Sequence, residues 1–300
     1  MNTNSHAPSG TAASYRDAPG RSITADGAGY AYRELGPKGG VPVIFLVHLA
    51  ATLDSWDPRV VDPIARDHHV ITFDNRGVGA STGQVPGSVE EMAQDAYSFI
   101  KALGFDTVDV FALSLGGMVA QSLADMHPEL VRKLILMGTG PKGGKSTDRV
   151  TPTTYLDMAR AALSRSDPKE YLFFTRDADG KRAAKEFVKR LQERTADRDA
   201  PISFKAFQAQ LKAIKNWGRA APMDLAMITQ PTLIANGDND RMVPTRFSED
   251  LHRRISGSEL VIYPGASHGS IFQFHEQFTS AAIEFLDRPP VNKNLTLGGR

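Results

Sequence analysis

The sequence contains no cysteine among its 300 residues. This absence excludes disulfide bonds, a thiolate nucleophile and zinc sites built from cysteine. A long hydrophobic run is also missing, because the longest apolar stretch, Val41–Ala51, is too short to span a bilayer. The first twenty residues are rich in Ser, Ala, Gly and Pro and have no apolar core, so we expect no signal peptide and a cytoplasmic protein.

An excess of charge of either sign is missing as well. The 35 Lys and Arg residues nearly balance the 34 Asp and Glu residues, for a formal net charge of +1. Such a chain has no global field that would attract nucleic acid or an anionic membrane, so we expect neither as a partner. The hydrophobic fraction of 41% and the charged fraction of 23% are ordinary for a globular protein. Assembly into a homo-oligomer is left open.

Short apolar runs recur along the chain, and their nearly continuous apolar content is typical of strands that are covered on both faces. Two earlier segments, Ser22–Ala25 and Tyr30–Leu35, alternate polar and apolar residues around Asp26-Gly27, which predicts an antiparallel edge hairpin. The apolar runs alternate with helical patterns, so we predict an α/β protein with a parallel sheet. The runs are Val41–His48, His69–Asp74, Val108–Ser114, Lys133–Gly138, Thr232–Gly237 and Glu259–Tyr263.

Helix signals separate these runs. Ser88-Val-Glu-Glu91 is a capping-box pattern and predicts a helix that ends near Gly104. A second helix is expected between Ser114 and Pro128, and a third over 269–287.

From about Pro141 to Asp224 no strand pattern occurs. A stretch of this length between two strands is too long for a loop, so we predict a helical cap packed over one end of the sheet. The expected organisation is a flexible arm over 1–21, a core over 22–140 and 225–287, a cap over 141–224 and a flexible tail over 288–300. The expected cap helices are Thr153–Leu163, Asp167–Thr175, Lys181–Glu193 and Ser203–Asn216.

Ser114 follows an apolar, β-rich strand and precedes a helical pattern. The segment is close to G-x-S-x-G, a strand–turn–helix elbow that exposes a serine hydroxyl at the top of a sheet, with Ala112 in place of the first glycine. The tight turn requires small residues two positions before and after the serine, and Ala112 and Gly116 are small. Because serine is a poor nucleophile without a base, a histidine and a carboxylate are expected nearby.

Two later strands are each followed by such a residue. Asp240 follows the strand Thr232–Gly237, and His268 lies in the small-residue loop after the next strand. The order Ser114, Asp240, His268 is the order expected for a triad built on this elbow. We predict that Ser114 is the nucleophile, His268 the general base and Asp240 the carboxylate that orients it, in preference to Asp238.

The oxyanion that forms during serine attack needs preorganised N–H donors. We expect one from the Leu115 backbone, at the start of the helix after the elbow. The second is expected from the loop after the strand Val41–His48, at the backbone of Ala50. No cofactor and no metal ion are expected at this site.

With these motifs in place, the sequence resembles the α/β-hydrolase fold superfamily from about Ser22 to Asp287. The segment Phe73–Ser81 is similar to the superfamily's aspartate–arginine–glycine loop, and Trp56 lies where members often carry an aromatic residue. The resemblance implies a mostly parallel eight-stranded sheet flanked by helices, with a helical cap inserted before the acid-bearing strand. For Asp74 and Arg76 we expect a salt-bridged turn near the floor of the site.

One departure from the superfamily concerns Leu49, where members usually have glycine after the histidine. A leucine restricts the backbone and adds bulk beside the oxyanion loop. Serine as the nucleophile also excludes the haloalkane dehalogenase and epoxide hydrolase subclasses, which use a carboxylate, and the dienelactone hydrolases, which use a cysteine.

We therefore expect a serine hydrolase that cleaves a small carboxylic ester or lactone, a small-molecule acyl substrate, through an acyl-enzyme intermediate. One alternative is a carbon–carbon bond hydrolase of a vinylogous diketone, with Arg160, Arg176 and Arg219 as candidate contacts for a substrate carboxylate. Another is a low-turnover ligand-binding member of the same fold, for which Leu49 is the sequence feature. The natural substrate is not fixed by the sequence.

The segment Gly138–Gly143 fits the dinucleotide-binding pattern G-x-G-x-x-G after a strand. A dinucleotide site would also need a helix that starts there and a second strand ending in an acidic residue. The long helical insertion supplies no such strand, so we reject this interpretation.

Overall fold

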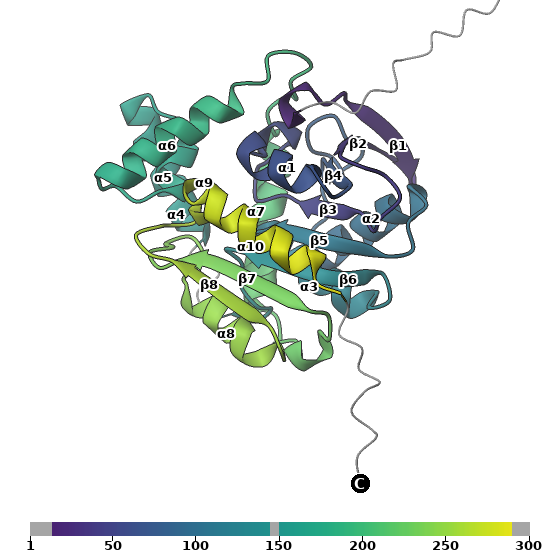
Figure 1. Cartoon of the computed structure of the whole chain (residues 1–300). Helices are drawn as coiled ribbons and strands as arrows, with labels where there is room; N and C mark the ends of the chain where they lie inside the picture. The colour runs from purple at the N-terminus through teal and green to yellow at the C-terminus, as the bar shows by residue number, and fades with distance from the viewer. Residues whose placement is uncertain (1–13, 145–149, 290–300) are drawn as a thin grey trace, which may run out of the picture.

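The computed structural model describes residues 14–144 and 150–289. Its centre is an eight-stranded sheet with the strand order β1-β2-β4-β3-β5-β6-β7-β8 (Figure 1). The strands are β1 (Arg21–Ala25), β2 (Ala28–Leu35), β3 (Val43–Leu46), β4 (Val70–Phe73), β5 (Val108–Leu113), β6 (Val131–Met137), β7 (Thr232–Gly237) and β8 (Glu259–Tyr263).

The sheet is parallel except at one edge. β1 pairs antiparallel with β2, and β2 pairs antiparallel with β4, whereas the pairs from β4 through β8 are parallel. The hairpin turns at Asp26 and Gly27, which both have positive φ angles, of 46° and 71°. This confirms the predicted edge hairpin and the predicted parallel core.

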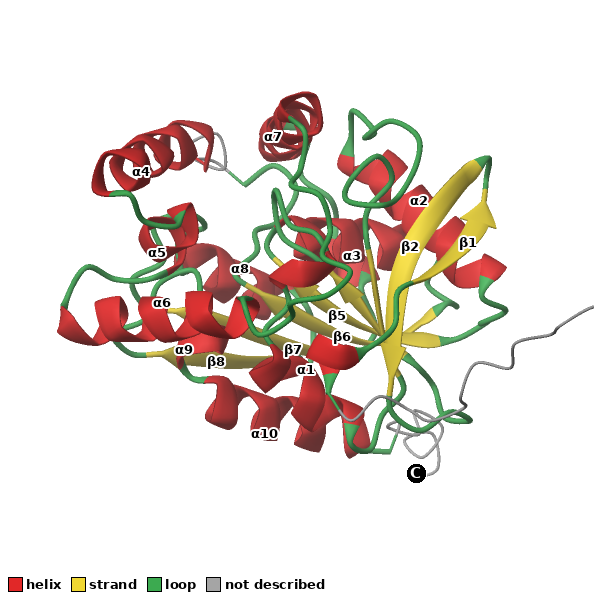
Figure 2. Ribbon diagram, turned by 90° about the horizontal axis from the view of Figure 1, so that it is seen from above, coloured by secondary structure: helices red, strands yellow, loops and turns green. Residues whose placement is uncertain are grey.

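Helices cover both faces of the sheet. Figure 2 shows α1 and α10 on one side and α2, α3 and α8 on the other. Four further helices, α4 to α7, lie between β6 and β7 in the sequence, and α4, α5 and α6 lie together at one side of the sheet in Figure 1. The helices are α1 (Pro58–Ala65), α2 (Val89–Ala102), α3 (Leu115–Met126), α4 (Val150–Ser164), α5 (Pro168–Phe173), α6 (Ala178–Leu191), α7 (Phe204–Arg219), α8 (Arg246–Arg254), α9 (Ser270–Gln273) and α10 (His275–Asp287).

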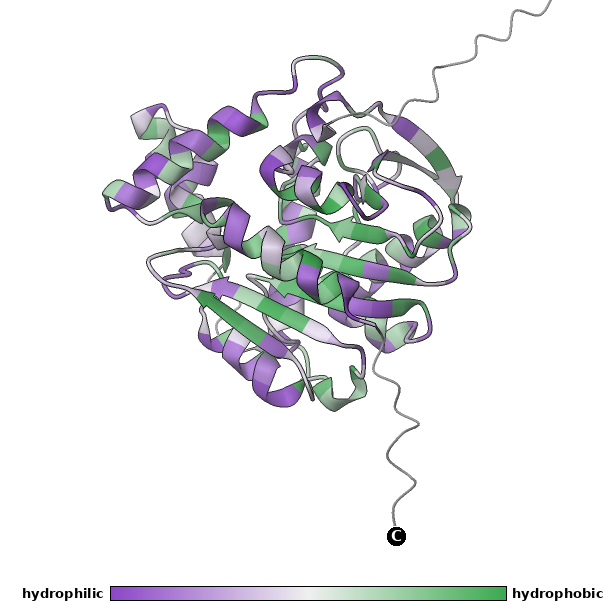
Figure 3. Ribbon diagram, viewed as in Figure 1, coloured by the Kyte–Doolittle hydropathy of each residue, from purple (hydrophilic) through white to green (hydrophobic). Residues whose placement is uncertain are grey.

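The alternation of side chains along each strand divides the core in two. On β5, Val110 and Ala112 belong to the cluster with α2, α3 and α8, and Phe111 and Leu113 to the cluster with α1 and α10. Figure 3 shows the central strands as hydrophobic, with hydrophilic stretches on α6 and α8. Burial on both faces explains why the strands read as continuous apolar runs rather than alternating ones.

Three helical features differ from the expectations. Two helices, α1 and α8, were not expected. α1 begins at a Pro after the N-cap Asp57. α8 is mostly charged, and Phe247 and Leu251 are among its buried residues. The helix expected over 269–287 is divided into α9 and α10 at Phe274, whose φ and ψ of −110° and 40° are not helical. The ring of Phe274 stacks on that of Tyr263, with centroids 5.2 Å apart.

The expected arm over 1–21 is not free throughout. Tyr15 is buried, and its hydroxyl donates a hydrogen bond to the backbone oxygen of Leu53 at 2.8 Å. The hydroxyl of Ser14 donates to Asp62 of α1 at 2.7 Å. The described start of the arm is therefore anchored by an aromatic side chain that finds a buried acceptor, while residues 1–13, 290–300 and 145–149 lie outside the described residues.

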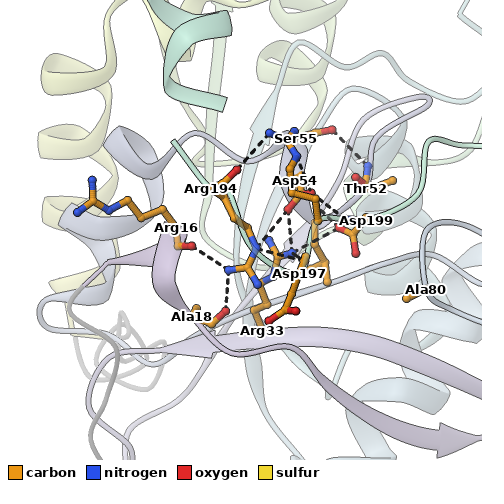
Figure 4. A network of polar contacts seen from close by, with 12 residues as sticks. Arg16, Ala18, Arg33, Thr52, Asp54, Ser55, Ala80, Arg194, Asp197 and Asp199 are labelled. Atoms are coloured by element: carbon orange, nitrogen blue, oxygen red, sulfur yellow. Dashed lines mark hydrogen bonds and ion pairs between the residues drawn. The ribbon is translucent and has the colours of Figure 1, made fainter. Parts of the chain in front are cut away.

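A buried charge network joins the segment after α6 to the edge of the sheet (Figure 4). Arg33 of β2 donates to Asp54 at 2.8 Å, and its side chain is only 2% exposed. Arg194, which follows α6, lies 3.7 Å from Asp54 and donates to the backbone oxygen of Ala18 at 2.9 Å. The network thus ties the inserted segment, the N-terminal segment and the loop after β3 together.

No helix in the described part of the chain is long and apolar enough to cross a membrane.

Candidate active site

Ser114 lies at the turn between β5 and α3, as predicted. Its φ of 57° and ψ of −113° are unusual for a residue with a side chain and are typical of a strained elbow. A Cβ at Gly116 would lie 2.1 Å from the backbone oxygen of Leu46, so this position admits only glycine. Ala112 is fully buried near the end of β5, where its methyl group is accommodated.

His268 and Asp240 are in direct contact. Nδ1 of His268 lies 2.7 Å from Oδ2 of Asp240, and both side chains are buried. A carboxylate oxygen accepts hydrogen bonds, so this contact favours the tautomer of a neutral imidazole that carries its proton on Nδ1 and its lone pair on Nε2. The other oxygen of Asp240 accepts from the backbone N–H groups of Met242 and Val243, which fixes the carboxylate.

Asp238 has a different environment. Its side chain accepts a hydrogen bond from Asn239 at 2.7 Å and is exposed, so it does not compete for His268.

Ser114 and His268 line one cavity of about 360 Å³. Its wall is mostly apolar, and residues of the core and of the inserted helices both contribute to it. The cavity is lined by His48, Leu49, Ala50, Ser114, Val150, Thr154, Met158, Asp167, Pro168, Lys169, Leu172, Phe173, Ile202, Phe204, Phe207, Met242 and His268. A mostly apolar pocket of this size, with a few convergent polar groups, is typical of a small-molecule site.

His48 belongs to this wall but is not a second base. Burial lowers its pKa to about 3, so the ring is neutral near pH 7. Its Nδ1 lies 2.8 Å from the backbone oxygen of Leu49, which can only accept, so Nδ1 donates there. The ring of Phe173 lies edge-on to His48 and to His268, with centroids 4.9 and 5.5 Å apart.

The two N–H groups expected to bind the oxyanion differ in their surroundings. Leu115 is the first residue of α3, so its N–H has no acceptor within the helix. The N–H of Ala50 instead donates to Oε1 of Gln210, on α7, at 2.8 Å. The sequence gave no signal for this contact, because the two residues are 160 positions apart.

Gly138 and Thr139, which follow β6, contact the site. Neither contact was indicated by the sequence. A Cβ at Gly138 would lie 3.1 Å from Nδ1 of His268, so the absent side chain makes room for the imidazole. Thr139 donates from its hydroxyl to the backbone oxygen of Ser114 at 2.8 Å. These residues open the segment that matched the dinucleotide pattern, so packing around the site accounts for this part of the motif.

The salt-bridged turn expected at Asp74 and Arg76 is seen for Arg76, but its partner is not Asp74. Arg76 pairs with Asp95 of α2 at 3.1 Å. Asp74 accepts from the backbone N–H groups of Leu53 and Ala80, at 2.8 and 3.1 Å, and so joins two loops. Burial, followed by the nearby charge of Asp199, raises the pKa of Asp74 to about 7. The short side chain is satisfied by backbone donors on both sides, and the arginine extends away to α2.

Charged groups at the cavity are few. None of the three arginines considered for a substrate carboxylate is among its lining residues: Arg160 pairs with Asp157, and Arg176 lies over the ring of Tyr171. Among the described residues that line the cavity, Lys169 is the one lysine or arginine, and it lies 3.7 Å from Asp167. Within the described residues, no group of three or more His, Asp or Glu side chains is placed to hold a metal ion.

The alpha/beta hydrolase fold family matches residues 41–274. The chain belongs to this family. A solved structure of an alpha/beta hydrolase fold protein from Chitinophaga pinensis is similar, with 38% identity, a TM-score of 0.86 and coverage of 92% of this chain and 99% of that one.

Curated relatives of this alpha/beta hydrolase carry several activities. A 2-hydroxy-6-oxononadienedioate/2-hydroxy-6-oxononatrienedioate hydrolase from Klebsiella pneumoniae is 32% identical, over 77% of this chain and 81% of that protein. A non-heme haloperoxidase from Rhodococcus erythropolis is 28% identical, over 81% of this chain and 90% of that protein. These relatives are named as enzymes, and the chain is an enzyme of the hydrolase fold.

Proposed function

We propose that this protein is a serine hydrolase that cleaves a small carboxylic ester or lactone through an acyl-enzyme intermediate. The observation that carries the proposal is the arrangement of Ser114 at a strained elbow with the hydrogen-bonded pair of His268 and Asp240 on the wall of the same cavity. A nucleophile, a base and a group that orients the base are the three parts that acyl transfer requires.

The chemistry follows from these positions. Nε2 of His268 accepts the proton of the Ser114 hydroxyl while the serine oxygen attacks the substrate carbonyl carbon. The carbonyl oxygen becomes an oxyanion, which the N–H of Leu115 and the N–H of Ala50 are expected to stabilise. His268 then gives its proton to the departing alcohol, and the acyl group remains on Ser114. Water, activated by His268, releases the acid and restores the serine.

The cavity supports a small and weakly polar substrate. Its volume of about 360 Å³ lies at the low end for small-molecule sites. Leu172, Phe207 and Met242 are among the apolar residues in its wall, and they favour an aliphatic or aromatic acyl group over a charged one. Met158 and Phe204 also line it and remain partly exposed, at 37% and 66%, so apolar side chains continue from the cavity to the surface.

Hydrolysis of p-nitrophenyl esters of increasing acyl length tests this proposal. We expect turnover by the wild-type protein, with an optimum at short acyl chains. We expect this turnover to be lost in Ser114→Ala. Ester turnover that survives in Ser114→Ala would overturn the proposal.

A second candidate is hydrolysis of a carbon–carbon bond in an acidic vinylogous diketone. Two observations favour it: the relative at 32% identity is named for a dienedioate substrate, and Lys169 places a cation on the cavity wall. Against it, Asp167 lies 3.7 Å from Lys169 and offsets part of its charge. In a competition between an acidic diketone and a neutral ester, preference for the diketone that falls in Lys169→Met would favour this candidate.

A further inference from the structure

Gln210 connects the inserted helices to the oxyanion loop. Its side chain is fully buried, and Oε1 accepts the hydrogen bond from the N–H of Ala50 at 2.8 Å. The partner is a donor, so the oxygen of the carboxamide must face it. The amide nitrogen Nε2 of Gln210 is buried and has no hydrogen-bond partner within the described residues.

The peptide between Leu49 and Ala50 is held at both ends. Its oxygen accepts from Nδ1 of His48 at 2.8 Å, and its N–H donates to Gln210. Ala50 itself has a φ of 61°, a left-handed conformation that is unfavourable for a residue with a Cβ. Such a conformation persists only where the surroundings hold it, and His48 and Gln210 are the groups that do so.

This arrangement conflicts with an oxyanion at the same donor. An N–H group has one hydrogen, and a substrate oxyanion 3 Å away would face the partial negative charge of Oε1 of Gln210. A carboxamide oxygen at this N–H resembles the carbonyl oxygen of a substrate. The amide of Ala50 can therefore serve Gln210 or the oxyanion, but not both at full strength.

We propose that Gln210 is a positioning residue that holds the Ala50 amide in the free enzyme and releases it to the substrate oxyanion. The inference rests on the proposed function, because only acyl transfer at Ser114 creates that oxyanion.

One residue of the cavity wall lies beside Gln210 on α7. Phe207 precedes it by three residues on α7, so the two side chains share one face of the helix. Phe207 lines the cavity, and its ring lies edge-on to Tyr155 of α4 with centroids 6.0 Å apart. Phe207 therefore places a side chain of the cavity wall on the same face of α7 as Gln210.

Three variants on α7 test the proposal. Gln210→Met keeps the size of the side chain and removes the acceptor, Gln210→Glu strengthens the acceptor, and Gln208→Met changes an exposed glutamine on the same helix as a control. If Gln210→Met does not fold, Gln210→Asn withdraws the oxygen by one methylene. The probe is butylboronic acid, which adds to the oxygen of Ser114 and places a boron hydroxyl where the oxyanion would lie.

Two measurements are made on each variant. The first is amide hydrogen exchange of the peptide that contains Ala50 in the free protein, where we expect faster exchange in Gln210→Met. The second is the inhibition constant of butylboronic acid with kcat and KM for p-nitrophenyl butyrate. We expect inhibition about 3- to 10-fold tighter in Gln210→Met and weaker by a similar factor in Gln210→Glu, with KM little changed.

Two results would overturn the proposal. Unchanged exchange at Ala50 in Gln210→Met would show that Gln210 does not hold the amide, whatever the activity. Weaker boronate inhibition and lower kcat in both Gln210 variants would make Gln210 a fixed support of the loop. If the natural sequence neither hydrolyses esters nor binds the boronic acid, the proposed function fails instead, and the exchange measurement still decides whether Gln210 holds the amide.

Discussion

Gly138 lies against the imidazole of His268, so closely that a methyl group on Gly138 would be 3.1 Å from Nδ1 and 3.2 Å from Cε1. The hydrogen bond from this Nδ1 to Asp240 fixes the ring, and Gly138 closes the space beside it. The position of this imidazole therefore depends on the absence of a side chain at Gly138 as well as on the carboxylate of Asp240.

In Gly138→Ala we expect kcat for ester hydrolysis to fall on the order of 10-fold or more, because the ring must move by a few tenths of an ångström. Gly104→Ala is the matched control: Gly104 also has a positive φ, of 86°, but nothing lies within 4 Å of the added carbon. Both variants should lose some thermal stability from backbone strain. Equal kcat in the two variants would show that Gly138 does not position the histidine.

Asp240→Asn should lower kcat on the order of 10³- to 10⁴-fold with little change in stability. An amide at this position favours the wrong tautomer of His268, and it cannot stabilise the imidazolium that forms as Ser114 attacks. Asp238→Asn, two residues away and exposed, should keep its activity. Steady-state ester hydrolysis distinguishes them, and a comparable loss in both would remove Asp240 from its assigned role.

Asp74 should make the protein less stable as the pH rises from about 4 to 7. Its pKa is raised to about 7 in the folded protein, against about 3.9 in an unfolded chain, so the folded state binds the proton more tightly across this range. The stabilisation is fully present below the unfolded pKa and is lost as the pH passes through the folded value. Urea midpoints at several pH values should fall less steeply in Asp74→Asn than in the exposed control Asp67→Asn. Parallel pH curves for these two variants would contradict this expectation.

Removal of Arg33 should destabilise the protein by about 3 kcal/mol, because Asp54 and Asp199 would remain buried without their main counter-charge. Arg194 and Arg198, at 3.7 and 3.6 Å from Asp54, limit the loss. Denaturant unfolding of Arg33→Met measures this change in the free energy of unfolding.

The control for this variant is Arg182→Met, which removes a pair whose side chains are 65% and 74% exposed and should change stability little. Similar midpoints for Arg33→Met and Arg182→Met would show that the buried network contributes nothing to stability.

The sequence predicted the sheet well, because residues buried on both faces leave long apolar runs. Every predicted run overlaps an observed strand, and the four expected helices of the insertion overlap α4 to α7. Ser114, Asp240 and His268 also came from local signals: small residues around Ser114, and acidic and histidine loops that directly follow strands. The catalytic roles of Ser114, Asp240, His268, Leu115 and Ala50 remain predictions.

The contacts that the sequence did not reveal are long-range ones. The partners of Arg76, Arg33 and Ala50 come from segments distant in the chain, and no local pattern links Ala50 to Gln210. α8 was missed for a different reason, since a helix with this many charged residues shows a narrow apolar face. Tyr15 was missed because a single aromatic residue in a polar segment resembles a flexible arm, although its hydroxyl finds a buried acceptor.

The central claim is that Ser114 is the nucleophile, and covalent labelling tests it most directly. The protein would be incubated with an alkyl fluorophosphonate, digested and analysed by mass spectrometry, with Ser114→Ala treated in parallel. We predict one phosphonyl group per chain, located on Ser114, and no labelling of Ser114→Ala. Absence of the adduct in the wild-type protein would contradict the claim. An equal adduct on another residue in both the wild type and Ser114→Ala would contradict it as well.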